Sequence, residues 1–309
     1  MDIMRKKTMK LAVIVSAAVW LGVLGMPAAT YASGVQPAAE AFLNTPEASD
    51  SHDELTLKGN AQFDGNYIKL NLSREGTLYS GNFAGITLNA KGKPYIAEGT
   101  IVDIDAKITQ PGGIELKFPR WSKDGDINKA VVVLPIGWLN EEQQAGLAAG
   151  SEISVNVKLQ GVQEPYVLKL PFKQEGVVRN IQPPAPKADS QFQIGTTRIA
   201  AGENSVRIAL AVKGVPEQAH HIGYDIYDNL GNELDMIARD SDAYTKDTIK
   251  DTIFEDLLYG AIRPDAEFLI IRPYQAVFEK GNQGLYKLDA KGNVIKNYYK
   301  QLEIKIPLK

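Results

Sequence analysis

The chain has 309 residues, of which 44% are hydrophobic and 23% charged, and its formal net charge is −3. This size and composition are typical of one large or two ordinary globular domains. The mild acidity argues against a nucleic-acid partner, which selects a basic surface. Because cysteine is absent, disulfide bonds, thiol catalysis and cysteine-based zinc sites are excluded.

Residues 1–32 have the three-part pattern of a secretory signal peptide. A basic start is followed by an uncharged, mostly apolar run at 11–26 and by small residues before Ser33. As a helix that run spans roughly 24 Å, less than the ~30 Å hydrocarbon core of a bilayer. We therefore expect cleavage after Ala32 and an extracytoplasmic location, secreted or in the cell envelope. The alternative is an uncleaved anchor, and only then does the chain engage a membrane through this helix.

Residues 33–50 read as a loose leader, and short runs of alternating apolar and polar residues follow it. This alternation is typical of strands with one buried face. In the first half it predicts strands at 55–63, 67–73, 85–88, 94–97, 100–108, 114–118, 130–134, 152–159 and 166–172.

Two stretches carry helix signals. After residue 139, Asn140 can cap a helix, Gln143 occupies the capping-box position, and Gly150 can end it. Within 245–260, apolar residues recur at a spacing of four, which fits a helix, although the matching stretch of the first half reads as strand.

The two halves of the chain match each other in order. Residues 67–73 match 206–212, 88–93 match 227–232, 130–135 match 268–273, and 168–173 match 304–309. We interpret this as a tandem duplication, with small loop-length differences between the copies. The predicted domains are 51–178 and 188–309, joined by a proline-rich linker at 179–187.

The predicted fold class is therefore all-β. Seven to nine short strands in each copy favour two tandem immunoglobulin-like β-sandwich domains, preceded by the signal-peptide helix. The Cys…Trp…Cys core of antibody domains is absent, so the prediction concerns architecture only.

One short pattern occurs three times, as LNAKGKP at 88–94, YDNLGNE at 227–233 and LDAKGNV at 288–294. An Asn or Asp can accept hydrogen bonds from the backbone that follows it, and the glycine three residues later can take positive φ. A calcium loop needs more carboxylates than these phrases offer. We predict a hairpin turn used three times.

Candidate metal ligands are few. Asp240, Asp242 and Asp251 fall at positions 1, 3 and 12 of an EF-hand-like spacing, but Thr245 stands where that loop needs glycine. They belong to the acidic segment 235–256, which would attract a cation or a basic partner. The alternative is a solvated acidic loop.

Other chemistry is hard to assemble from this sequence. The three histidines are His52, His220 and His221, and adjacent residues of a strand point to opposite faces. No nucleophile-elbow, zinc-protease or phosphate-loop motif is present. Trp121 is a candidate platform for a sugar, with packing against the core as the alternative. We predict no enzyme activity and no cofactor.

The apolar start, the phrase FDGNYIKLNLS, the hairpin YDNLGNEL and the closing LPF resemble a group of uncharacterised extracytoplasmic domain families of Gram-positive bacteria. Such domains occur in membrane proteins that look like anti-sigma factors. Here only ten residues precede the apolar run, too few for their cytoplasmic sigma-binding part. The resemblance implies an extracytoplasmic setting and a sandwich fold.

Three functions are consistent with these observations. The first is a non-catalytic secreted or envelope-associated binding protein whose partner is an unknown protein or envelope component. The second is a carbohydrate-binding or carbohydrate-active protein of the cell wall. The third is an extracytoplasmic sensor held by the N-terminal helix.

Overall fold

The computed structural model describes residues 46–52, 54–76, 79–110, 113–137, 139–214, 222–241, 252–279 and 285–309. Ala276–Asn297 belongs to one compact unit, and the described residues of the rest form another. The predicted signal peptide lies outside the described residues. Within them, no helix has the length and apolar character needed to cross a bilayer.

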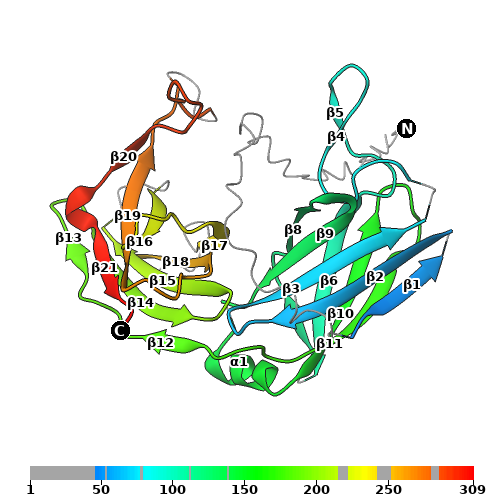
Figure 1. Cartoon of the computed structure of the whole chain (residues 1–309), viewed down its shortest axis with the longest axis horizontal. Helices are drawn as coiled ribbons and strands as arrows, with labels where there is room; N and C mark the ends of the chain where they lie inside the picture. Colours follow the sequence, from blue (N-terminus) through cyan, green and yellow to red (C-terminus); the bar gives the residue numbers. More distant parts are fainter. Residues whose placement is uncertain are drawn as a thin grey trace, which may run out of the picture. The chain divides into compact units, whose positions relative to one another are not determined.

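The described chain is all-β and built from antiparallel sheets (Figure 1). A first sheet pair consists of a five-stranded sheet, β1-β2-β3-β9-β8, and a four-stranded sheet, β11-β10-β6-β7. Their bounds are β1 Ala48–His52, β2 Leu55–Phe63, β3 Tyr67–Glu75, β6 Ile101–Gln110, β7 Ile114–Leu116, β8 Arg120–Asp124, β9 Asp126–Pro135, β10 Ser151–Leu159 and β11 Tyr166–Phe172. The hairpin β4 (Thr87–Leu88) and β5 (Pro94–Tyr95) is a separate two-stranded sheet.

Alternation explains the core of this sheet pair. Every second residue of β11 is buried, from Tyr166 to Phe172, and the residues between them are exposed. In β3, Ile68, Leu70 and Leu72 enter the same core. Because strand residues two apart share a face, one side of each sheet is covered and the other is solvated.

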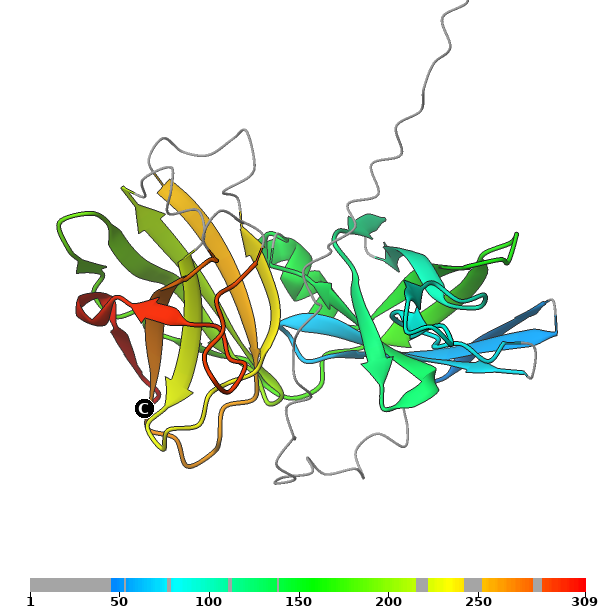
Figure 2. The ribbon, with the colours of Figure 1, turned by 90° about the horizontal axis from the view of Figure 1, so that it is seen from above.

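A second sheet pair follows. One sheet has the order β12-β14-β15-β18-β17, with β13 also paired to β14, and the other has β16-β19-β20, with β21 also paired to β19. Their bounds are β12 Arg179–Ile181, β13 Lys187–Ala188, β14 Gln193–Ala201, β15 Ser205–Lys213, β16 Ile222–Asp228, β17 Met236–Ser241, β18 Thr252–Gly260, β19 Phe268–Ala276, β20 Lys296–Tyr298 and β21 Ile304–Pro307. A second group of buried residues, from Phe192 to Leu308, fills this pair. Figure 2 shows the strands of the two pairs from above.

The predicted helix after residue 139 is confirmed as α1, Glu141–Ala148. Asn140 caps it, and the side chain of Gln143 accepts from the backbone N–H of Asn140, so the predicted capping box is present. Gly150 ends the turn at φ +108° and donates to Leu147. A short 3₁₀ turn, η4, covers Lys300–Leu302.

The helix signal within 245–260 is wrong where the structure describes it, because Thr252–Gly260 is the strand β18. β18 lies between β15 and β17, and residues of both of its faces are buried near its end. Leu257 and Tyr259 enter the second core, whereas Leu258 packs in a small cluster with Tyr67. A strand that is apolar on both faces loses the alternation by which strands are recognised.

The leader and the linker are more ordered than expected. The end of the leader forms β1, which pairs with β2 from Ala48 to His52. Both ends of the linker pair with β14, through β12 and β13. Pro183, Pro184 and Pro186 lie between these two short strands, and a proline cannot donate to a sheet ladder.

Two of the four matches between the halves fall on strands with different neighbours. Residues 130–135 belong to β9, beside β3, whereas 268–273 belong to β19, between β16 and β21. The hairpin at Asn89 forms its own two-stranded sheet, whereas the turn at Asp228 begins at the last residue of β16. The match of 130–135 with 268–273 therefore aligns two strands with different places in their sheets.

The thrice-used turn is confirmed at all three places. The oxygen Oδ1 of Asn89, Asp228 or Asp289 accepts from the backbone N–H groups two and four residues later, at 2.8–3.0 Å. The glycine at the fourth position has φ of +71°, +88° and +86° in chain order. The Asn or Asp side chain therefore accepts the hydrogen bonds of the turn's backbone N–H groups, and the glycine supplies the left-handed conformation.

Candidate functional site

The β4–β5 hairpin and the residues beside it carry four exposed large apolar side chains. Ile86 is 60% exposed, Leu88 64%, Tyr95 46% and Ile96 54%. Thr87 pairs with Tyr95 and Leu88 with Pro94, so Tyr95 and Leu88 lie on opposite faces of the hairpin. Single exposed apolar side chains are ordinary, but several on one short hairpin make it a candidate binding surface. Figure 1 shows the hairpin projecting from its sheet pair.

The tip of this hairpin is a tight, basic turn. Leu88 pairs with Pro94 in the ladder, and the Asn89 turn joins the two strands. Lys91 and Lys93 are exposed in the turn, and their backbone groups bond to Asn89: both N–H groups donate to its Oδ1, and the Lys93 carbonyl accepts from its N–H. The turn therefore does not require their ammonium groups.

The root of the hairpin is held by a buried arginine. Arg74, at the end of β3, is 3% exposed and shares the core-facing side of that strand with Leu72. Its guanidinium donates to the carbonyl oxygens of Gly81 and Gly99, the latter across 2.8 Å. Its Nε donates to Asn128 Oδ1 at 3.0 Å.

The base of the hairpin is packed as well as hydrogen-bonded. The ring of Phe83 is fully buried in the first core, and the guanidinium of Arg74 lies 5.6 Å from its centroid. The backbone of Phe83 bonds to Ile127 and Ile101 at 2.7 and 2.8 Å. The exposed apolar side chains thus extend from a fixed base, which limits the entropy lost when the hairpin binds.

A second hairpin, within Ala276–Asn297, has a similar composition. Its backbone ladder includes Ile295 N–H to Lys287 O at 2.9 Å and the bridge between Leu288 and Val294, and the Asp289 turn lies at its end. Leu285, Tyr286 and Leu288 are exposed. Each hairpin therefore carries exposed aliphatic and tyrosine side chains next to the same kind of turn.

The structure gives Asp240 a partner other than a metal ion. Its Oδ1 accepts from Arg120 at 3.2 Å, and the same guanidinium also donates to the backbone oxygen of Arg239. Burial raises the pKa of the Asp240 carboxyl. The other two candidate ligands, Asp242 and Asp251, lie outside the described residues. Within the described residues, no group of three or more His, Asp or Glu side chains could hold a metal.

Further acids of the segment 235–256 are also paired. Glu255 is buried and accepts two hydrogen bonds from Arg239, at 2.7 and 2.8 Å. Asp256 accepts from Arg207 at 2.7 Å. Three acids in its described part, Asp240, Glu255 and Asp256, are therefore paired with arginines, whereas the acids at 242–251 lie outside the described residues.

Trp121 lies on the edge strand β8, half-buried against the first core. A sugar platform needs an open indole face, so this packing leaves less of the ring available. The strand itself was not predicted, because its polar sequence RWSKD lacks alternation.

His52, at the end of β1, packs against Tyr166 of β11. Its ring stacks on Tyr166 at 3.8 Å, and Tyr166 donates to its backbone oxygen at 3.0 Å. His220 and His221 lie outside the described residues.

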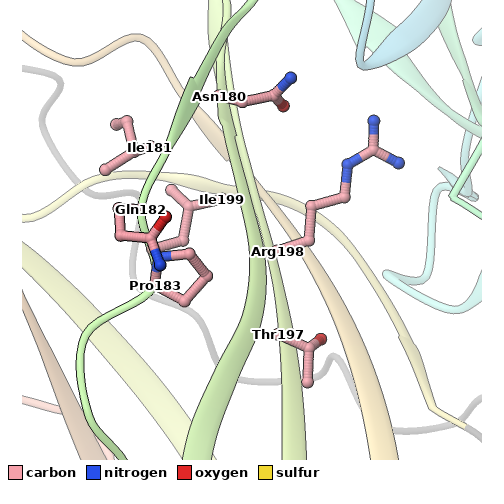
Figure 3. Close-up of a pocket in the computed structure, with 7 residues that line it drawn as sticks. All are labelled: Asn180, Ile181, Gln182, Pro183, Thr197, Arg198 and Ile199. Carbon is pink, nitrogen blue, oxygen red and sulfur yellow. The ribbon is translucent and has the colours of Figure 1, made fainter.

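A shallow pocket lies where β12 passes β14. Figure 3 shows Ile181, Gln182 and Pro183 beside Ile199, while the side chain of Arg198 extends away from them. It coincides with the register shift of β14 between Thr196 and Arg198. Arg198 is the single titratable group of this lining, so the pocket itself supplies no acid–base pair.

Comparison with known proteins gives a fold and no family. No model of a protein family matches the chain, and no curated protein matches it. Among solved structures, the chain is similar to one described as "the crystal structure of the conserved domain protein from Bacillus anthracis", with 14% identity and a TM-score of 0.54. The match covers 89% of this chain and 95% of that one. At this identity the similarity concerns the fold alone.

Proposed function

We propose that the protein is a non-catalytic binding protein of the cell envelope or the extracellular space, which engages its partner through the β4–β5 hairpin. The observation that carries the proposal is the group of four exposed apolar side chains on this one hairpin. Keeping such a group in water costs free energy that binding would recover.

The proposed architecture is two tandem immunoglobulin-like β-sandwich domains that arose by duplication. The strand orders support it, since β2-β3-β9-β8 parallels β14-β15-β18-β17 and β11-β10-β6 parallels β21-β19-β16. The closing match of 168–173 with 304–309 falls on β11 and β21, which are equivalent in this scheme.

The proposed location rests on the sequence of residues 1–32 and on the resemblance to extracytoplasmic domains of Gram-positive bacteria. Mass spectrometry of the protein made in a Gram-positive host is expected to show an N-terminus near Ser33. Retention of residues 1–26 in the membrane fraction would instead favour the anchored sensor.

Binding to isolated cell envelope tests the proposed function. We expect secreted wild-type protein to sediment with the envelope, and Leu88→Glu with Ile96→Glu to abolish most of this binding. Val177→Glu is the matched control, because Val177 is 82% exposed and lies outside the hairpin. Equal binding by the double variant and the wild type would refute the proposal, and release of soluble sugars would favour the carbohydrate-active alternative.

A further inference from the structure

The chemistry of the hairpin points to one kind of partner. Aliphatic side chains, a tyrosine and lysines combine here within residues 86–96. This combination suits the boundary between water and lipid, where apolar side chains enter the acyl region, tyrosine lies at the headgroup level and lysines face anionic headgroups.

The charge of the two hairpin segments also favours an anionic partner. Residues 81–98 contain two lysines against one glutamate, and residues 276–297 contain four lysines against two acids, whereas the whole chain has a net charge of −3. Both apolar hairpins are therefore positive segments of an acidic protein. Positive charge beside apolar surface is complementary to an anionic interface.

The presence of two such hairpins favours a lipid surface over a protein. A protein partner must be matched in shape to each hairpin, whereas a bilayer is a continuous surface that either hairpin can enter by itself.

From these observations we propose that the β4–β5 hairpin docks onto an anionic lipid bilayer, with Ile86, Leu88, Tyr95 and Ile96 in the interface and Lys91 and Lys93 at the headgroups. This deepens the proposed function and rests on it, since it names the partner of the same hairpin. The Ala276–Asn297 hairpin is a second contact of the same kind.

A fluorescent label tests this directly. The chain has no cysteine, so Leu88→Cys creates a single labelling position for an environment-sensitive dye, and Val177→Cys is the control. In the full chain, vesicles of phosphatidylcholine with phosphatidylglycerol are expected to shift the emission of the dye at 88 to shorter wavelength. Phosphatidylcholine vesicles alone, and dye at 177, are expected to give no shift.

Charge substitutions make the test specific. Lys91→Gln with Lys93→Gln is expected to weaken the vesicle titration about 25-fold, because each lysine near an anionic surface contributes about fivefold. Lys169→Gln with Lys173→Gln, on exposed positions of and beside β11, removes the same charge elsewhere and is expected to change the titration little.

The outcomes separate this inference from the proposed function. An equal shift with both lipids would overturn the requirement for anionic headgroups. No shift with either lipid, together with envelope binding that still depends on Leu88 and Ile96, would overturn the lipid partner and leave a protein or glycan partner. Loss of dependence on the hairpin in both assays would overturn both proposals.

Discussion

The guanidinium of Arg74 donates from Nη1 to the carbonyl oxygen of Gly99 across 2.8 Å. The same group also donates to Gly81, so both chain ends of the β4–β5 hairpin are tied to β3. A buried arginine is costly to desolvate, and three hydrogen bonds offset that cost. The consequence is a hairpin whose exposed apolar side chains are presented from a rigid base.

Arg74→Met is expected to lower the free energy of unfolding by roughly 3 kcal/mol, because it leaves the buried carbonyls at the hairpin root without their donor. It should also speed amide hydrogen exchange within 81–99. Chemical denaturation and exchange mass spectrometry measure the two effects. Arg263→Met, which removes an exposed pair with Asp265, is the control. If both variants unfold like the wild type, Arg74 does not stabilise the hairpin root.

The turn glycines make a second prediction. Gly231 has φ of +88°, and an added Cβ would meet no atom within 4 Å, so only backbone strain opposes substitution. Gly231→Ala is expected to cost about 1 kcal/mol of stability, and Gly231→Asn less, because asparagine tolerates the left-handed region. Thermal melts of the two variants decide this, and identical costs would contradict the turn assignment.

Asp64 makes the stability depend on pH. Its Oδ1 accepts from the backbone N–H groups of Asn66 and Tyr67, at 2.9 and 3.2 Å, and Ser205 donates to Oδ2. Burial raises the pKa of Asp64 above its ordinary 3.8. The folded state then binds more protons than the unfolded one, so stability falls as pH rises from 3.8 through the raised folded pKa and stays lower above it.

Asp64→Asn is expected to remove this part of the decline in stability, because an amide does not titrate. The amide also keeps the acceptor for Asn66 and adds a donor for Ser205, so the local structure is expected to persist. Melting temperatures across that pH range test it, with Asp103→Asn on the exposed face of β6 as the charge-matched control. An unchanged pH slope in Asp64→Asn would show that another group is responsible.

The buried pair of Arg239 and Glu255 gives a fourth prediction. Glu255→Gln weakens a bidentate contact and leaves Arg239 without its charge partner, so a loss of roughly 3 kcal/mol in stability is expected. Asp265→Asn, in the exposed pair with Arg263, should leave the denaturation midpoint unchanged. A loss of equal size in the two variants would contradict the role of burial.

The sequence predicted those elements whose signals are local. β2 and β11 have the predicted bounds because alternation begins and ends at turn residues, and α1 follows its capping box. β8 was missed because an edge strand does not need alternation, and β18 resembled a helix because apolar residues of both its faces are buried near its end.

The candidate site was harder to predict, because it depends on which side chains the tertiary contacts leave exposed. Residues 85–88 and 94–97 were expected to be ordinary strands, since sequence records that Leu88 and Ile96 are apolar but not that they are exposed. Arg74 stands in a polar strand end, SRE, and nothing local indicates that it faces the core. Exposure and burial at these positions follow from tertiary contacts of β3 with the chain around Gly81 and Gly99.

Lipid docking of the hairpins is tested by hydrogen exchange of the full chain with and without phosphatidylglycerol-containing vesicles, because exchange reports on every part of the chain. We expect slower exchange on the vesicles within 81–99 and 285–296, and unchanged exchange in the pocket strands β12 and β14. Protection confined to β12 and β14, with the hairpins unchanged, would contradict it.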